Sequence, residues 1–253
     1  MTDLRGGITG SVRGSLSADA LWTPAALGSS LLAMWDAERS DLITQSGGAV
    51  SSWRDVVAGY EMAQTTPAAR PTYSATSFNN RPGITFDGVQ QFLEAGAIPL
   101  PAGAAPCEVW ALVDQTAPGS DATGRRIFSY GSGTNDTREI YRITPSGLNR
   151  LTAAIGNGAT RVFPDSPIVD FSGRRIARMV ITSTECRLEV DGTSAAAAAV
   201  VPATVVARAR IGASANAATA ANFYQGGLSI ALMTGALTTE QAAMLYAYLG
   251  ARR

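Results

Sequence analysis

The sequence predicts an all-β protein built as a two-sheet antiparallel sandwich, with one short helix near its C-terminus. Short apolar runs recur along the chain, and clusters of Gly, Pro, Asn and Asp separate them. This punctuation is typical of β-sandwiches. Of the 253 residues, 46% are hydrophobic, which suits one large all-β domain with a complete core.

The first 22 residues differ from the rest because they are rich in Gly and Ser, with Ile8, Val12 and Leu16 spaced apart. Alone, such a segment cannot bury enough apolar surface to fold. We expect an N-terminal arm over residues 1–22 and one sandwich domain over residues 23–253. The arm is either a disordered tail or a segment that becomes ordered on a larger assembly, where it would serve attachment or oligomerisation.

Apolar runs in the first half of the domain predict a series of strands, at 31–35, 83–86, 92–95, 109–113, 127–130 and 140–143. The run 109–113 holds no polar residue, which favours a strand buried on both faces. Asp87-Gly88 lies between two of the runs and predicts a hairpin there. Trp35, Trp53 and Trp110 fall inside such runs, so we expect them in the core.

The second half alternates more regularly. Apolar and charged residues alternate over 186–190, which predicts a strand with one face of each kind, and Asp191-Gly192 predicts a turn. The runs 205–211 and 228–232 repeat the alternation, so Leu228, Ile230 and Leu232 should share a face. Arg208 and Arg210 should form an outward, solvated stripe. The alanine run 195–199 directly follows the turn, which favours strand or loop over helix.

One helix is signalled at the C-terminus. Thr238 and Gln241 have the spacing of a capping box. Apolar residues then follow at helical spacing, and Gly250 ends the pattern; they are Met244, Leu245, Tyr248 and Leu249. We expect a short lid packed on the edge of the sandwich.

Missing residue types exclude several chemistries. The chain has no His, and all 20 of its basic residues are Arg. The usual Ser-His-Asp and Cys-His nucleophile systems, P-loops and Lys Schiff-base sites are therefore excluded. Cys107 and Cys186 give zinc no plausible ligand set and are expected to be buried free thiols. A formal net charge of zero predicts no nucleic-acid partner.

The order of segments resembles a known family, the concanavalin A-like or laminin-G-like jelly-roll domains of bacterial surface proteins and of phage or gene transfer agent virions. The resemblance runs from about residue 30 to residue 250, and its segments include 32–37, 50–55, 70–73, 80–88, 189–192, 211–214 and 223–228. It implies a jelly roll. It says little about the ligand, because this fold hosts lectins, hydrolases and interaction modules.

Glycoside hydrolases with the fold that this resemblance implies share a strand motif, E-x-D-x-x-E, whose alternate carboxylates face one cleft. Glu189 and Asp191 begin the pattern, but Ser194 stands at its last position. Arg187 lies between Glu185 and Glu189 on one face, as in a solvated ion ladder. We therefore expect no enzyme activity.

Calcium is possible but is not predicted, and no other cofactor is expected. The carboxylate and amide candidates lie in loops and fit capping roles better; they are Asp36, Asp41, Asp114, Asp121, Asp136 and Asn157. A glycan site is expected around a Gly-rich loop, where Arg side chains could bind acidic sugars. Its candidate residues are Arg125, Arg126, Tyr130, Asn135, Asp136, Arg138 and Tyr141.

The resemblance and the arm together favour a non-catalytic spike or fibre protein on a virion surface that binds a bacterial surface polysaccharide for attachment to the host cell. The alternatives are a purely structural virion protein without a glycan site and a bacterial surface adhesin. No signal peptide opens the chain and no apolar run is long enough to span a membrane. We expect assembly in the host cytoplasm, contact with other virion proteins through the arm, and homo-oligomers.

Overall fold

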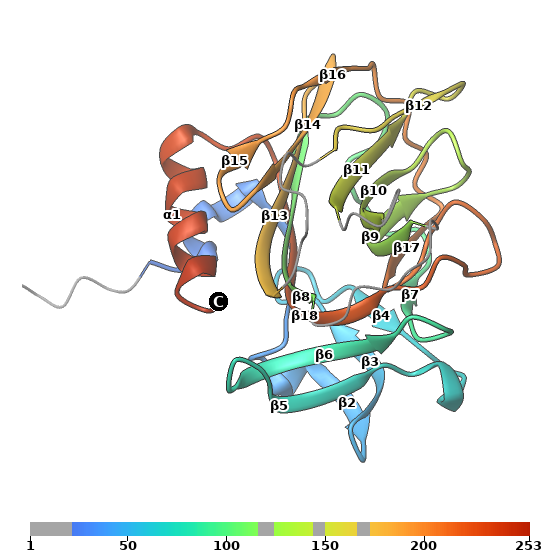
Figure 1. Ribbon diagram of the computed structural model, residues 1–253, viewed down its shortest axis with the longest axis vertical. Coiled ribbons are helices and arrows are strands. Elements are labelled where there is room, and N and C mark those ends of the chain that lie inside the picture. The colour runs from blue at the N-terminus through green and yellow to red at the C-terminus, as the bar shows by residue number, and fades with distance from the viewer. Residues whose placement is uncertain (1–21, 116–123, 144–149, 166–172) are drawn as a thin grey trace, which may run out of the picture.

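The computed structural model describes residues 22–115, 124–143, 150–165 and 173–253, without the side chains of Gln115 and of 141–143. Apart from Trp22, the predicted N-terminal arm lies outside these residues, and so does Asp121. Two β-sheets face each other, and the C-terminal α-helix lies outside one of them (Figure 1). The predicted all-β sandwich with a short C-terminal helix is confirmed.

The first sheet is centred on two long strands. β8 (Cys107–Gln115) pairs with β13 (Gly173–Ile181) on one side and β18 (Gln225–Thr234) on the other. β14 (Glu185–Val190) extends the sheet beyond β13, and β1 (Leu31–Asp36) extends it beyond β18. All these pairs are antiparallel. The apolar run at 109–113 is therefore central, as its composition predicted.

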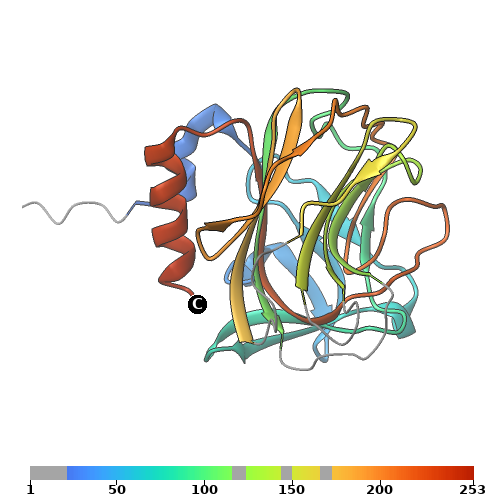
Figure 2. The ribbon, with the colours of Figure 1, turned by 45° about the horizontal axis from the view of Figure 1, so that its top comes forward.

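The second sheet lies opposite the first across the core. Its strands follow one another as β11 (Arg150–Gly156), β10 (Arg138–Ile143), β9 (Arg125–Gly131), β17 (Arg208–Ile211) and β7 (Leu93–Ala95). Again every pair is antiparallel. In Figures 1 and 2 these strands form a layer of their own on the far side of β8 and β13 from the helix.

Shorter strands join the two sheets along one side. β6 pairs with β18 of the first sheet and with β5, β3 pairs with β5 and β4, and β4 pairs with β7 of the second sheet. The bounds of this group are β2 (Ile43–Ser46), β3 (Ala49–Arg54), β4 (Glu61–Ala63), β5 (Thr72–Phe78) and β6 (Arg81–Asp87). The remaining short elements are η1 (Pro24–Ser30), η2 (Ser40–Leu42), η3 (Pro67–Ala69), β12 (Arg161–Val162), β15 (Thr193–Ser194) and β16 (Ala198–Ala199).

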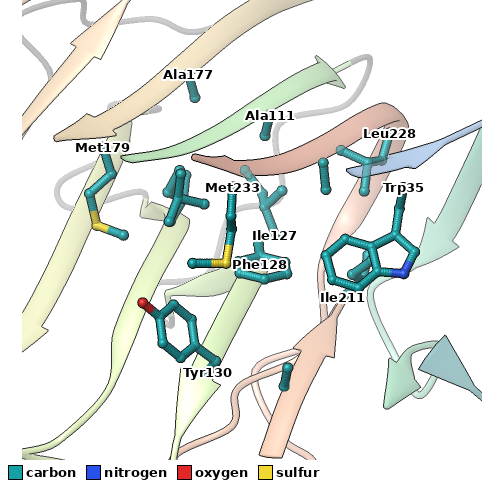
Figure 3. Packing of buried hydrophobic residues seen from close by; sticks show 14 of the residues in the cluster. Trp35, Ala111, Ile127, Phe128, Tyr130, Ala177, Met179, Ile211, Leu228 and Met233 are labelled. Atoms are coloured by element: carbon teal, nitrogen blue, oxygen red, sulfur yellow. The ribbon is translucent and has the colours of Figure 1, made fainter. Parts of the chain in front are cut away.

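The main core fills the space between the sheets. Trp35, Phe128, Tyr130 and Met233 project into it from both layers (Figure 3). Trp35 and Phe128 lie with their ring centroids 5.9 Å apart. Trp35, Trp53 and Trp110 are all fully buried, as predicted. Cys107 and Cys186 are buried free thiols, and burial raises the pKa of Cys186 to about 12.

A second apolar cluster lies on the outer face of the first sheet, under the helix α1 (Thr239–Gly250). Leu245 and Leu249 of α1 pack there against Trp110, Leu112 and neighbouring strand residues. The predicted capping box is present, since Gln241 N donates to Thr238 Oγ1 at 3.2 Å and Thr238 N donates to Gln241 Oε1 at 3.0 Å. The helix covers a sheet face, so its predicted position at the edge was wrong.

The hairpin predicted around Asp87-Gly88 is also absent, because β6 and β7 belong to opposite sheets. Asp87 Oδ1 accepts hydrogen bonds from the backbone N–H groups of Val89, Gln90 and Gln91. These bonds hold the chain in a wide turn that carries it across the sandwich. A DG pair therefore marks a change of sheet here.

A bulge in β18 contradicts the expectation that Leu228, Ile230 and Leu232 share a face. The register with β8 shifts between Leu228 and Ile230. Leu228 consequently points into the main core, whereas Ile230 and Leu232 point outward toward α1. An extra residue in a strand reverses the facing of all that follow it, so the three residues do not share a face.

Removal of a buried contact from α1 tests the second core. Leu245→Ala, at a residue with no exposed surface, is expected to lower the free energy of unfolding by about 2–5 kcal/mol because it leaves a cavity. Met244→Ala, at the neighbouring residue with 39% exposure, is expected to cost less than about 1 kcal/mol. Urea unfolding of both variants makes the comparison, and equal losses would contradict the packing.

Candidate functional site

A large pocket lies between α1 and the outer face of the first sheet. Its volume is about 550 Å³, within the range of roughly 300–1,000 Å³ that is usual for ligand sites. Polar and charged side chains line one part of it, namely Glu108, Arg178, Thr182, Arg187, Glu189, Thr239 and Tyr246. The apolar part is lined by Pro106, Val180, Ile181, Ala236, Leu237, Ala242 and Ala243.

A buried guanidinium organises the floor of this α1 pocket. Arg178 Nε and Nη2 donate to the two carboxylate oxygens of Glu108 at 2.9 and 2.8 Å. Arg178 Nη1 donates to Glu189 Oε2 at 2.7 Å. The three residues come from β13, β8 and β14, so one side chain joins three adjacent strands. Its guanidinium also lies 4.8 Å from the ring centroid of Trp110, within cation–π range.

Both carboxylates receive further hydrogen bonds. Trp110 Nε1 donates to Glu108 Oε2 at 3.1 Å, and the backbone N–H of Leu237 donates to Glu108 Oε1 at 3.3 Å. The hydroxyl of Tyr246 donates to Glu189 Oε2 at 3.2 Å. Tyr246 lies on α1 and Leu237 just before it, so these bonds attach the helix to the sheet and fix one wall of the pocket.

The electrostatics of the floor keep Glu189 ionised. Burial disfavours its charge, but the guanidinium of Arg178 and the hydrogen bonds that the carboxylate accepts outweigh burial and lower its pKa. Burial, together with the charge of Glu189, raises the pKa of the Tyr246 hydroxyl. Tyr246 therefore keeps its proton at neutral pH and can donate it in a hydrogen bond.

The predicted solvated ladder of Glu185, Arg187 and Glu189 is half correct. Arg187 Nε donates to Glu189 Oε1 at 3.1 Å, and its Nη1 lies 4.0 Å from Glu185 Oε1. Glu189, however, is buried beneath α1 and is not solvated. The sequence analysis missed Glu108, Arg178 and Tyr246 as site residues. A usable signal was present, since Glu108 and Arg178 are charges of opposite sign that interrupt the apolar runs 107–113 and 176–181.

The residues of the predicted glycan site divide into two groups, because β9 separates them. Arg125 and Arg126 lie at its start, and Tyr141 on β10 is the register partner of Arg126. Arg125 Nη1 donates to Gly88 O at 3.0 Å. Arg126 is buried and donates to Glu139 Oε2 at 3.3 Å. The side chain of Tyr141 lies outside the described residues.

Tyr130 and Arg138, at the other end of β9 and β10, are fully buried between the sheets. Arg138 Nε donates to Thr204 Oγ1 at 2.8 Å, and its Nη2 donates to Gly103 O at 2.8 Å. The guanidinium thus joins the loop at Gly103 to the loop at Thr204. Neither side chain has a surface to offer a ligand, because the alternation of β9 and β10 points both inward.

Asn135 and Asp136 are partly exposed in the β9–β10 loop and fold that loop. Asp136 Oδ1 accepts from the backbone N–H of Ser132 at 2.9 Å and of Gly133 at 2.6 Å. Asn135 Nδ2 donates to Ala159 O at 2.6 Å. The structure therefore does not bring the seven predicted residues together in one site.

A second buried ion cluster lies on the outer face of the second sheet. Glu139 pairs with Arg126 and Arg161, and it accepts hydrogen bonds from Ser129 Oγ at 2.9 Å and Ser214 Oγ at 2.8 Å. Burial alone would raise its pKa, but the two guanidinium groups and the hydroxyl donors lower it. These bonds draw the loop after β17 across the sheet.

Arg210 fastens the same loop, so its predicted place in a solvated stripe was wrong. It is buried, and its guanidinium donates to the backbone oxygens of Ser214, Ala217 and Ala218. Its Nε donates to Glu94 Oε2 at 2.5 Å. Arg208 is partly exposed and donates to Ser132 O and Ala215 O.

Several of the candidate calcium ligands serve local structure instead. Asp36 Oδ1 accepts from Glu38 N at 2.9 Å, Asp41 pairs with Arg39, and Asn157 Oδ1 caps the loop at Ala159 N. Among the described residues, no three His, Cys, Asp or Glu side chains lie close enough together to hold a metal ion. In the same part of the chain, no helix is long and apolar enough to cross a membrane.

Comparison with known proteins gave no matching family model and no matching curated protein. Solved structures do share the fold. Domain 4 of a GH43 extracellular arabinanase from Geobacillus stearothermophilus, solved in complex with arabinotriose, has a TM-score of 0.58 at 14% identity, and the match covers 85% of this chain and 98% of that one. An arabinofuranosidase complexed with arabinofuranosyl-alpha-1,2-xylobiose has a TM-score of 0.60 at 12% identity, over 88% and 59% of the two chains.

A Trypanosoma rangeli sialidase has a TM-score of 0.55 at 11% identity, over 86% of this chain and 32% of that one. The chain thus spans 59% of the arabinofuranosidase and 32% of the sialidase. At these identities the likeness shows a fold found in carbohydrate-active proteins. The expectation that the chain is not an enzyme is overturned, because its structural neighbours include glycoside hydrolases.

Loss of the central guanidinium tests the floor of the α1 pocket. Arg178→Met leaves Glu108 and Glu189 buried without their shared partner. We therefore expect the free energy of unfolding to fall by about 3–5 kcal/mol. Arg54→Met removes an exposed pair, with Arg54 Nη2 3.6 Å from Glu61 Oε2, and should cost about 1 kcal/mol or less. Chemical denaturation of the two variants measures the difference between their losses of unfolding free energy. Equal losses would contradict the buried position of Arg178.

Acid should destabilise the fold through Glu139 and Glu189. Because folding lowers the pKa of both, their contribution is complete above the unfolded Glu pKa of about 4.3 and is lost as pH falls through the folded values. The melting temperature should drop steadily below about pH 5. Glu139→Gln should flatten this drop, whereas Glu61→Gln, at an exposed site, should not. An unchanged pH profile in Glu139→Gln would refute the account.

Proposed function

We propose that this chain is a carbohydrate-binding β-sandwich protein that holds a neutral oligosaccharide in the α1 pocket. The observation that carries the proposal is the pocket itself. A cavity of about 550 Å³ combines apolar lining residues with fixed hydrogen-bonding groups. Sugar rings present the same two surfaces, because their C–H faces are apolar and their rims carry hydroxyls.

The floor supplies partners that hold their positions. Arg178 is fixed by three hydrogen bonds and by the Trp110 ring, and Tyr246 is fixed by Glu189. A ligand that meets groups already held in place loses less affinity to their ordering. Arg187 is half-buried at the side of the pocket and gives a further guanidinium within reach of a ligand.

The charge of the pocket favours a neutral sugar over an acidic one. The lining holds two carboxylates, Glu108 and Glu189, and two guanidinium groups, Arg178 and Arg187. Their formal charges cancel, and Arg178 is already shared between both carboxylates. An anionic ligand would have to compete with these carboxylates. The acidic polysaccharide expected from Arg125 and Arg126 is therefore not the preferred ligand here.

The structural neighbours agree with this proposal at the level of the fold. One of them is a domain solved with arabinotriose, which the present chain matches over 98% of that domain's length. This neighbour suggests arabinotriose as the first probe. Location on a virion, attachment through residues 1–22 and homo-oligomerisation stay predictions, and cryo-electron microscopy of a particle carrying the chain would test them.

Blocking the pocket should weaken binding. Ala243 is exposed and lines the α1 pocket, so Ala243→Trp should fill it and reduce affinity for arabinotriose at least tenfold, measured by isothermal titration calorimetry. Ala247→Trp is the matched control, because Ala247 lies one helical turn further on and lines a different hollow. It should bind as the unaltered chain does.

A second variant probes the polar side of the pocket. Arg187→Gln should weaken binding about tenfold if the guanidinium bonds a sugar hydroxyl, since a hydrogen bond to a charged group contributes about 1.5–3 kcal/mol. An acidic trisaccharide of equal length should bind more weakly than arabinotriose. Equal affinity in Ala243→Trp and the unaltered chain would refute this pocket, and release of shorter sugars during titration would identify turnover.

A further inference from the structure

The outer face of β8 carries a carboxylate near each end. Glu108, Trp110, Leu112 and Asp114 alternate along this face, and they lie opposite core residues such as Val113. Glu108 belongs to the floor of the α1 pocket. Asp114 lies six residues further on, about 20 Å away at the usual rise of a strand, and none of the contacts described so far involves its side chain.

The two carboxylates differ in how well they are satisfied. Glu108 accepts four hydrogen bonds, two of them from Arg178. Asp114 is equally buried, with 6% of its surface exposed, but its Oδ2 has only Arg174 Nε at 3.4 Å. Its Oδ1 is buried and has no hydrogen-bond partner. Buried carboxylate oxygens are nearly always paired, so an unpaired one requires an explanation.

Asp114 lines a separate small pocket of about 180 Å³ between β18 and the β5–β6 strands. The other lining residues are Ser77, Thr85, Phe86, Gln225, Gly226 and Gly227. Ser77 Oγ donates to Gly83 O, and Thr85 Oγ1 donates to Thr72 O, both at 3.3 Å. Each hydroxyl thus uses its hydrogen and keeps its oxygen as an acceptor. Asp114, Ser77 and Thr85 therefore offer side-chain acceptors to a ligand in this pocket.

Glycine makes the space for this pocket. A Cβ at Gly227 would lie 3.3 Å from Asp114 Cβ, and a Cβ at Gly226 would lie 2.7 Å from Asp114 O. Gly226 also has φ +148°, which other residues rarely adopt. Larger residues at these two positions would crowd Asp114 and close the hollow.

We propose that this Asp114 pocket binds one small neutral polyol unit, such as a single sugar residue, with a ligand hydroxyl donating to Asp114 Oδ1. A neighbouring hydroxyl of the same ligand would donate to Thr85 Oγ1. The volume is below the roughly 300 Å³ at which pockets for larger ligands begin, so one unit fits and a chain does not. The site stands on its own geometry and does not depend on the α1 pocket.

A cation fits the pocket less well than a hydroxyl does. Asp114 is the single charged residue among the described lining residues, and Arg174 already lies against its other oxygen. The local charge is therefore balanced, and a metal ion would gain one shared carboxylate. Burial raises the pKa of Asp114, in keeping with a carboxylate that lacks donors. A neutral donor removes this deficit without adding charge.

The test is an amide ¹H–¹⁵N NMR titration of the full chain with L-arabinose and, separately, glycerol. The amides of Gly226 and Gly227 should shift with millimolar affinity. Asp114→Ala should weaken this response about tenfold or more, because it removes the charged acceptor. Thr85→Val, which keeps the shape of the pocket, should weaken it severalfold and decides the matter if Asp114→Ala does not fold. Glu61→Ala, an exposed carboxylate outside the pocket, should leave the response unchanged.

The same spectra separate this site from the α1 pocket, which has its own reporters in the amides of Leu237, Ala242 and Ala243. Shifts at Gly226 and Gly227 that persist in Ala243→Trp support an independent polyol site. No shift at these glycines, or a shift that Asp114→Ala leaves intact, overturns the proposal. Shifts of the Gly226 and Gly227 amides with calcium chloride, but with neither polyol, would also overturn the proposal, because they would identify a cation site.

Discussion

The candidate site depends on one buried guanidinium. Arg178 binds Glu108 and Glu189 at 2.7–2.9 Å and so joins three strands of one sheet. Glu189 in turn accepts from Tyr246, which attaches α1 to that sheet. Two like charges beneath a helix are tolerable only because a cation lies between them, since an unpaired buried charge costs several kcal/mol. These bonds hold α1 beside the apolar cluster that it covers and thereby fix one wall of the pocket.

The second sheet also has a buried carboxylate–arginine cluster, which holds a loop where the first holds a helix. Glu139 is surrounded by Arg126 and Arg161 and by two serine hydroxyls. Its partner Ser214 belongs to the loop after β17, which Arg210 also holds. Each sheet thus has a buried carboxylate–arginine cluster on its outer face that holds a covering segment. The first leaves a pocket beside it, whereas the second draws its loop onto the sheet.

Much of the fold was predictable from the sequence because local patterns carried it. The strand at 107–115, the turn at Asp191-Gly192 and the capping box at Thr238 are all decided within a few residues. The glycan site was not predictable in this way. Proximity along the chain suggested that Arg125 and Asn135 act together, yet they lie at opposite ends of β9 and its following loop. The pocket instead combines residues from 108 to 246, which no local pattern connects.

The sequence by itself determined the class of fold, the burial of Trp35, Trp53, Trp110 and both cysteines, and the absence of histidine and lysine chemistry, because composition and period-two patterning depend on each segment alone. Tertiary structure decided which face each charge occupies. The bulge before Ile230 reverses β18, and the turn at Asp87 sends β7 to the other sheet. Whether Asp114 finds a donor or Glu108 finds Arg178 depends on strand neighbours far away in the chain, and only the folded arrangement specifies them.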